Sequence, residues 1–278
     1  MKMKTSNLIW KTIVYLILSI GAIMMLFPLF WMLSVSLMTN IEVERIGVWW
    51  PEVPQWRNYI DTFTILPFGT WTQNTMMITA FTIVGALFSN TLVAYGFARF
   101  RAKGRNFLFM VMLGTMMLPS TVTMIPLFTI FRDLGWVNTF LPLIVPAYFG
   151  NAFFIFLLRQ FFLGLPSELE DAAKMDGLGT IGILIRIMLP MILPALTTVA
   201  IFQFNGAWND FMGPLIYLNT PDMFTLALGI NFFRGQNHVQ WNFLMVASLV
   251  SMLPSLIIFF VGQKYFIEGI SVSSGVKG

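Results

Sequence analysis

Long apolar stretches without charged residues dominate the pattern along the chain. A helix needs about 20 mostly apolar residues to cross a bilayer. Six stretches free of Asp, Glu, Lys and Arg meet this length, at residues 12–41, 62–98, 106–131, 134–158, 187–209 and 235–263. In the second stretch, the apolar part begins near Gln73. The pattern therefore predicts an all-α, polytopic membrane protein with six transmembrane helices.

The first stretch follows three lysines, a feature it shares with secretory signal peptides. A signal peptide has an apolar core of about 7–15 residues and a small-residue cleavage site. This stretch is about twice that length and contains no such site. We therefore expect it to be a retained first helix.

Positive charge is unevenly distributed between the two sets of loops. Lys and Arg are enriched in cytoplasmic loops. If the N-terminus is inside, four basic residues lie outside: Arg45, Arg57, Arg132 and Arg234. The other twelve lie inside: Lys2, Lys4, Lys11, Arg99, Arg101, Lys103, Arg105, Arg159, Lys174, Arg186, Lys264 and Lys277. This asymmetry predicts that both termini are cytoplasmic.

The composition supports the membrane assignment and narrows the chemistry. The 278 residues are 57% hydrophobic and only 10% charged, whereas soluble domains contain about 25% charged residues. The chain has no cysteine, one histidine (His238) and no Gly-x-x-x-x-Gly-Lys-[Ser/Thr] motif. We therefore expect no catalytic residue, no metal site, no bound cofactor and no nucleic-acid partner, and we do not expect an enzyme.

The inner polar segment, residues 160–190, is the most informative part of the sequence. Ser167 is followed three residues later by Glu170, which predicts a capping box, and Glu168 and Asp171 also lie in the first turn, where a helix favours anions. Gly177 stands where a glycine would end this helix. The pattern predicts a short helix, a sharp break and a second helix returning to the membrane. This unit is either a structural elbow or a plug for a cleft in a cytoplasmic partner.

The outer segment, residues 38–72, is rich in tryptophan. It contains Trp49, Trp50 and Trp56. Tryptophan favours the membrane–water interface. The segment is therefore either an interfacial anchor or a docking surface for an extracellular partner.

The inner segment resembles the EAA loop of ABC-type importer permeases. The family pattern is Glu-Ala-Ala, three residues, Gly, nine residues, Ile, one residue, Leu-Pro. Here the matching residues are Asp171, Ala172, Ala173, Gly177, Ile187, Leu189 and Pro190, at the same spacing. Asp171 replaces the first Glu and keeps its charge.

Two further stretches are similar to carbohydrate-type permeases, and the resemblance covers roughly residues 49–278. Residues 207–211, with Pro214 and Leu215, resemble their fifth-helix signature. Residues 263–270 and 275–278 resemble the C-terminus of the maltose-transporter G-type subunit. Asn58-Tyr59 and Asn74-Thr75 also suit that subfamily.

The resemblance implies a type I importer permease for sugars or oligosaccharides in a bacterial or archaeal plasma membrane. The implied partners are a second, homologous permease, two copies of a cytoplasmic ATPase that binds ATP and Mg, and an extracellular or periplasmic sugar-binding protein. The implied regions are a first helix with an outer segment (1–72), a core (73–266) with a coupling loop (160–190), and a cytoplasmic tail (267–278).

The resemblance also implies roles for two sets of residues. The ATPase-coupling set is Glu168, Glu170, Asp171, Ala172, Ala173, Asp176, Gly177, Leu189 and Pro190. The tail set, which would reach the ATPase interface, is Gly269, Gly275, Lys277 and Gly278.

Trp208, Asn209 and Asp210 are candidate pathway residues. An aromatic ring beside an amide suits sugar binding, but the same residues also suit helix packing or an interfacial position. Two alternative functions stay open. They are an ABC importer for another polar solute, such as a glycerol phosphate or a peptide, and a secondary transporter that works without ATP.

Overall fold

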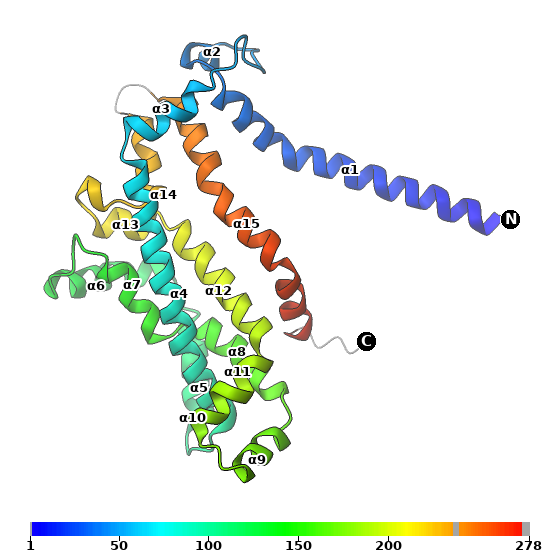
Figure 1. Cartoon of the computed structure of the whole chain (residues 1–278), viewed down its shortest axis with the longest axis vertical. Coiled ribbons are helices and arrows are strands. Elements are labelled where there is room, and N and C mark those ends of the chain that lie inside the picture. The colour runs from blue at the N-terminus through cyan, green and yellow to red at the C-terminus, as the bar shows by residue number, and fades with distance from the viewer. Residues whose placement is uncertain (1, 236–238, 274–278) are drawn as a thin grey trace. The chain divides into compact units, whose positions relative to one another are not determined.

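The computed structural model describes residues 2–235 and 239–273, and these residues form helices and connecting turns (Figure 1). The helices are α1 Lys2–Ser36, α2 Asn40–Glu44, α3 Arg57–Ile65, α4 Phe68–Arg99, α5 Arg105–Thr115, α6 Ser120–Asp133, α7 Leu141–Ile144, η1 Val145–Phe149, α8 Ala152–Gly164, α9 Glu168–Met175, α10 Thr180–Ile183, η2 Leu184–Met188, α11 Leu189–Met191, α12 Leu193–Trp208, α13 Met212–Tyr217, η3 Pro221–Met223, α14 Leu226–Gly229, η4 Ile230–Arg234 and α15 Trp241–Ser273. No strand occurs in this part of the chain.

Four helical segments are long and apolar enough to cross a membrane. They are Trp10–Ser36, Phe68–Arg99, Leu141–Gly164 and Trp241–Gln263. Two bent pairs of helices also qualify, each as one broken span: α5 with α6, and Thr180–Met191 with α12. Counting each pair once gives six spans in the described residues, which agrees with the sequence prediction.

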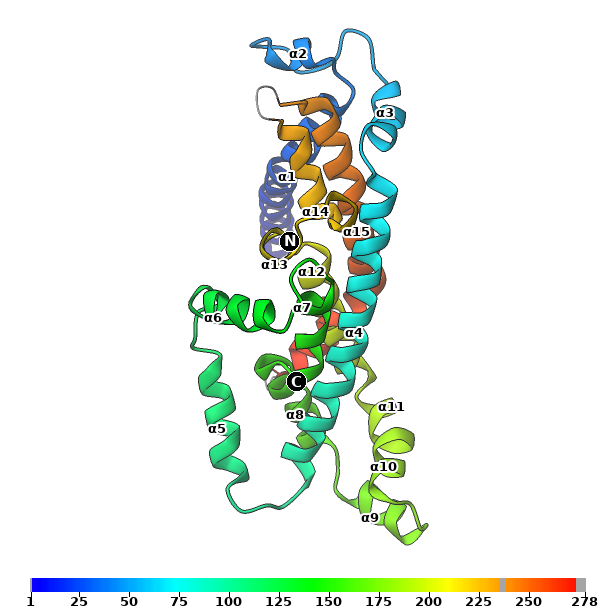
Figure 2. The same cartoon turned by 90° about the vertical axis from the view of Figure 1, so that its left-hand side faces the viewer.

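Proline accounts for both bends. The α5–α6 pair bends by 96°, and Pro119 caps the start of α6 with an extended ψ of 134°. Figure 2 shows α6 running across the direction of α5. The second pair bends by 80° at Ile192, just before Pro194 in the first turn of α12. Proline lacks an N–H group, so it is tolerated where a helix starts and disfavoured where one continues.

The fourth apolar stretch is helical over only part of its predicted length. Residues 134–140 form turns, and regular helix begins at Leu141. Gly135 and Asn138 adopt φ values of 71° and 60°, which a continuous right-handed helix cannot contain. The span in this stretch therefore runs from Leu141 to Gly164 instead of starting at residue 134.

One compact unit comprises the residues up to 68 together with 230–252. Asn58 is buried in this unit, and its amide donates to the carbonyl oxygens of Ser36 and Met38, both at 2.9 Å. Asn242 donates to the Asn58 carbonyl oxygen at 3.3 Å. Tyr59 places its hydroxyl 3.0 Å from the Ser36 hydroxyl. The Asn58-Tyr59 pair thus ties α3 to the end of α1.

The outer tryptophans of this unit pack back against α1. Trp50 stacks on Phe30 with ring centroids 5.8 Å apart, and Trp49 meets Trp31 edge-on at 5.4 Å. The Ser34 hydroxyl donates to the Trp49 carbonyl oxygen at 2.6 Å. This packing produces an aromatic cluster at the end of the first span.

The second unit comprises residues 69–229 and those from 253 onward. Its core is formed by α4, α8 and the helices from α10 to α12. Tyr95, Leu158, Phe162, Met188 and Val199 are almost fully buried there. In both views α9 lies beyond the ends of α4 and α8 (Figures 1 and 2).

Candidate functional site

The end of α9 is set by local backbone chemistry, as predicted. Gly177 has a φ of +82°. Its N–H group donates to the Lys174 carbonyl at 3.0 Å, and the Leu178 N–H group donates to the Ala173 carbonyl at 3.0 Å. These two bonds form a Schellman motif, which reverses the chain. Gly177 therefore creates the elbow between α9 and the helix that returns to the core.

The start of α9 differs from the prediction, and the expected capping box is absent. Ser167 adopts helical angles (φ −69°, ψ −25°), and its side chain makes no capping hydrogen bond. A capping hydroxyl usually needs extended backbone angles. Thr39, with ψ 155°, forms this motif with Glu42 instead, at the start of α2. Glu170 is left free for another partner.

That partner is Arg99, the last residue of α4. The Arg99 Nε and Glu170 Oε1 atoms lie 3.2 Å apart, and each side chain is only 11% exposed. The N–H direction falls outside hydrogen-bond geometry, so the contact is an ion pair. The Arg99 Nη2 group also donates to the carbonyl oxygens of Phe162 and Leu165, at 2.7 and 2.8 Å. Arg99 thereby joins α4, the end of α8 and the start of α9.

Tyr95 completes this buried polar cluster from α4. Its hydroxyl lies close enough to interact with the Glu170 carboxylate, and its ring packs against Phe162 with centroids 5.4 Å apart. Removing one partner of a buried ion pair is destabilising, because the remaining charge stays buried without a counter-ion. We call Tyr95, Arg99 and Glu170 the α9 clamp, and it holds the short helix on the core.

The opposite face of α9 is exposed and mostly acidic. Glu168, Asp171 and Asp176 are exposed, and Asp171 forms an ion pair with Lys174 at 3.1 Å. Met175 is 89% exposed among them. An exposed methionine beside carboxylates is typical of an adaptable docking surface.

The two alanines of the EAA-like motif face opposite ways. Ala173 is buried in the core of the second unit, whereas Ala172 is exposed. Gly177 is also exposed, and a Cβ atom placed on it would meet nothing within 4 Å. The motif thus combines anchoring residues with residues available to a partner.

Leu189 and Pro190 lie at the end of the returning helix. This helix contains a π-helical turn at η2, where the Leu189 N–H group bonds to the Leu184 carbonyl. Pro190 has no N–H group, and its ring would clash with the carbonyl four residues earlier in a regular helix. The wider π turn accommodates it. Leu189 is half-buried and Pro190 is exposed.

The three candidate pathway residues do not share one surface. Trp208 is only 3% exposed and stacks on Phe204 with centroids 5.4 Å apart. The Asp210 Oδ1 atom accepts a hydrogen bond from the Gly213 N–H group at 3.0 Å, which caps α13. Asn209 alone is exposed, and Asn205 lies one turn earlier, exposed as well. The structure thus gives Trp208 a packing contact and Asp210 a capping contact.

A small polar pocket adjoins Asp210. Its polar lining residues are Thr82, Gln203, Asp210 and Thr225. Its volume is about 150 Å³. Ligand pockets usually measure about 300–1,000 Å³. This pocket is therefore too small for an oligosaccharide in the conformation observed.

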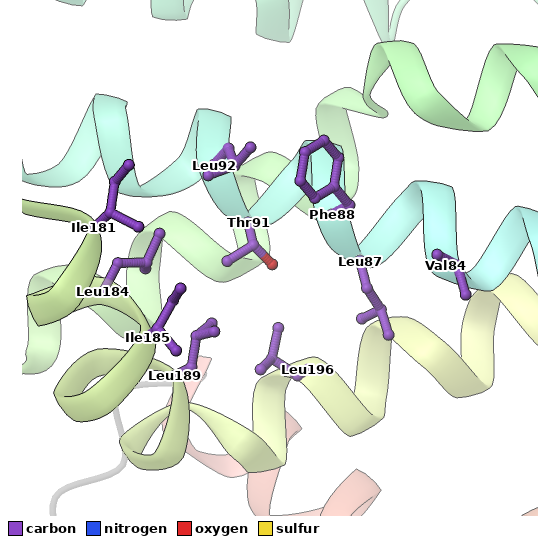
Figure 3. A pocket seen from close by; sticks show the side chains of 10 residues that line it. All are labelled: Val84, Leu87, Phe88, Thr91, Leu92, Ile181, Leu184, Ile185, Leu189 and Leu196. Carbon is purple, nitrogen blue, oxygen red and sulfur yellow. The ribbon is translucent and has the colours of Figure 1, made fainter.

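A larger groove lies beside the helical segment Thr180–Met191, which returns from the elbow to the core. Its volume is about 660 Å³, and its lining, shown in Figure 3, is aliphatic and aromatic except for Thr91. The side chains come from α4 and from the segment between α10 and α12. Burying sugar hydroxyls without hydrogen-bond partners is costly. This groove suits hydrocarbon or apolar side chains, and it does not suit a sugar.

Several predicted residues lie outside the described part of the structure. Gly275, Lys277 and Gly278 of the tail set and His238 are among them. Gly269 falls within the described backbone of α15.

Sequence reasoning did not assign Arg99 to the site. It appeared only as one of the basic residues that orient the loops. An available signal was its place as the first charged residue after a long uncharged stretch. That position brings Arg99 to the membrane boundary, but only the fold brings it to Glu170.

Comparison with known proteins gives a consistent set of similarities. Residues 90–272 match the model of the family described as binding-protein-dependent transport system inner membrane component. The arabinooligosaccharides transport system permease protein AraQ of Halalkalibacterium halodurans is 36% identical over 287 residues, covering 100% of both chains. AraQ of Bacillus subtilis is 36% identical, covering 96% of this chain and 95% of its own.

A solved structure agrees in fold over almost the whole chain. A crystal structure of a bacterial ABC transporter involved in the import of the acidic polysaccharide alginate contains a chain with a TM-score of 0.84. It is 25% identical and covers 94% of this chain and 98% of that one. The protein therefore belongs to the family of binding-protein-dependent transport system inner membrane components. It is a multi-pass transport subunit rather than an enzyme.

Proposed function

We propose that the chain is the permease subunit of an ATP-driven importer for sugars or oligosaccharides, and that it forms half of the translocation pathway. The observation that carries this proposal is α9, a short helix held on the core by a buried ion pair and exposing an acidic face. The sugar class is supported by the substrates named for AraQ and for the alginate transporter.

In this proposal, α9 is the coupling helix. A helix of eight residues is marginal on its own. The α9 clamp and the Schellman turn at Gly177 hold it so that its exposed face can seat in a cytoplasmic ATPase. Because Arg99 contacts both α8 and α9, a push on α9 passes directly to two spans.

We also propose that Asn205 and Asn209 face the pathway or the second permease. Both belong to the end of the fifth span and expose their side chains. An amide exposed to lipid is costly, so polar residues in spans usually face water or another protein. Trp208 and Asp210 support this surface through packing and capping.

The proposed orientation puts both termini, α9 and the loop between α4 and α5 in the cytoplasm of a bacterium or archaeon. The support is the twelve-to-four distribution of basic residues. The proposed partners are a homologous permease, two ATPase copies and a sugar-binding protein. ATP and Mg bind the ATPase in this scheme, and the C-terminal tail contacts it.

The test is transport by the reconstituted complex. The chain would be placed in proteoliposomes with the second permease, the ATPase and the binding protein. Labelled arabinooligosaccharides and alginate oligosaccharides would be offered with and without ATP. We expect uptake of one sugar class that requires ATP, the ATPase and the binding protein.

Two results would overturn parts of this proposal. Sustained uptake by the chain without the ATPase would indicate a secondary transporter. Uptake of a glycerol phosphate or a peptide, with no sugar transported, would retain the coupling mechanism but change the substrate class.

A further inference from the structure

A cluster of basic residues lies at the junction of α4 and α5. Arg101, Lys103 and Arg105 line a hollow of about 470 Å³. Arg101 and Lys103 are exposed, and Arg105 is half-buried. The loop is held in shape by Arg105, whose Nη1 group donates to the Phe100 carbonyl at 2.8 Å.

This cluster has no acidic partner among the described residues. The ion pairs in the described part of the chain involve other basic residues, and Glu170 pairs with Arg99. Arg159, from α8, brings a fourth positive charge near this cluster, since its Nε group donates to the Phe97 carbonyl on α4 at 3.2 Å. It lies over the Phe109 ring, 4.2 Å from the ring centroid. Four cations without a carboxylate form a site of positive potential that favours an anion.

An apolar crevice continues from the basic hollow between α4 and α5. Its apolar lining is Val93, Gly96, Phe97, Phe100, Ala102 and Leu108, and its volume is about 280 Å³. Lys103 and Arg105 line both the hollow and the crevice. The two spaces are therefore contiguous, with positive charge at the mouth and hydrocarbon surface behind it.

We propose that this site binds an anionic phospholipid. Its headgroup phosphate would lie among Arg101, Lys103 and Arg105, and an acyl chain would lie against Phe97 and Leu108. Basic pockets between spans are suited to such headgroups. A soluble ATPase could neutralise the charges, but it would leave the apolar crevice unfilled. This inference goes beyond the transport function proposed above and does not depend on it.

The test measures lipid retention by the full-length chain purified in detergent. Native mass spectrometry would count bound phosphatidylglycerol and phosphatidylcholine at equal supply. We expect phosphatidylglycerol to be retained preferentially, and the triple variant R101Q/K103Q/R105Q to lose at least tenfold in its apparent affinity.

A matched control removes equal charge elsewhere. The variant R45Q/R132Q/R234Q alters three basic residues distant in sequence, and we expect it to retain phosphatidylglycerol like the parent chain. Size-exclusion profiles would show that both triple variants are folded. Equal retention by R101Q/K103Q/R105Q and the parent chain would overturn the proposal, even if the variant lost ATPase binding.

A second variant tests the acyl chain and separates a lipid from free phosphate. Gly96→Leu fills the crevice without changing charge, and a Cβ atom at Gly96 meets only the flexible Phe100 ring at 3.9 Å. Leucine also favours the helix more than glycine does. We expect G96L to lose phosphatidylglycerol as well. Full retention of phosphatidylglycerol by G96L, with inorganic phosphate competing for the same charges, would show that the cluster binds the phosphate group alone, and it would refute a site that also holds an acyl chain.

Discussion

At Gly177, a substitution can affect both the backbone of the turn and the contact with a docked partner. Its φ of +82° is disfavoured for other residues, at a cost of about 1 kcal/mol. Among the described residues, no atom lies within 4 Å of the position that a Cβ atom would take here. A substitution there therefore acts through backbone strain and through contact with a docked partner.

We expect Gly177→Asp to insert normally in the membrane and to abolish ATP-dependent uptake. Gly179→Asp is the matched control, because Gly179 has an ordinary φ of −72° at the start of α10 and equally open surroundings. Aspartate is favourable at that helix start. Membrane yield and uptake would be measured for both. Wild-type uptake by G177D would contradict the coupling role of the elbow.

The hydrogen bonds of Glu42 make the stability of the outer segment depend on pH. The Thr39 N–H group donates to its carboxylate at 2.7 Å and the Glu52 N–H group at 3.0 Å. The Thr39 bond is the main reason that the pKa of Glu42 falls below its ordinary 4.5, and burial opposes it. Because the folded state favours the ionised form, this stabilisation is complete above the unfolded pKa. It is lost as the pH falls through the lower folded pKa.

We therefore expect residues 39–55 to become less protected as the pH falls below about 4.5. Hydrogen–deuterium exchange, corrected for the intrinsic effect of pH, would measure this change. Glu42→Gln should remove most of the acid dependence. Glu52→Gln is the control, because its exposed side chain only pairs with Arg45 at 3.7 Å. The same acid profile in E42Q as in the parent would refute this origin.

At the scale of elements, the α9 clamp joins the short helix to two spans. Glu170→Ala leaves Arg99 buried without its counter-ion. We expect the free energy of unfolding to fall by about 2–3 kcal/mol. Uptake per assembled complex should fall further, since α9 would lose its attachment.

The double variant R99M/E170M distinguishes stability from coupling. Replacing a whole buried pair with apolar residues is often neutral for stability. We expect thermal unfolding in detergent close to that of the parent chain. A double variant as unstable as E170A would show that other contacts of Arg99, such as those to Phe162 and Leu165, dominate the clamp.

The contact between α14 and the start of α4 depends on Gly229. A Cβ atom there would overlap the ring of Trp71, which is 1% exposed and donates from Nε1 to the Pro221 carbonyl at 2.8 Å. We expect Gly229→Ala to destabilise the second unit by about 1–3 kcal/mol. Gly69→Ala, on α4 with open space around it, should be neutral or slightly stabilising. Thermal unfolding of the two variants would check this contrast.

At the scale of the whole molecule, the absence of native cysteine allows a direct test of topology. Glu44→Cys and Met175→Cys place thiols at exposed positions in the proposed outer and inner segments. We expect a membrane-impermeant maleimide to label E44C in intact cells and M175C only after permeabilisation. Ala195→Cys, at a fully buried position, should not be labelled in either case. The reverse order for E44C and M175C would invert the proposed orientation.

The spans, the family motif and the turn at Gly177 can all be predicted from the amino-acid sequence alone. These features depend on hydrophobic length, on the spacing of residues 171–190 and on the conformational freedom of one glycine. Each is local along the chain, so it can be recognised without knowing what lies next to it.

The contacts between residues far apart in the chain become visible only in the folded protein. Arg99 reaches Glu170 across 71 positions because α4 and α8 pack side by side, and this removes the capping role that the local pattern predicts for Glu170. Trp208 is buried and stacks on Phe204, whereas Asn209, the next residue in the sequence, is exposed. The physical reason is the same in each case: ion pairing and burial depend on distances between elements, which the order of residues does not specify.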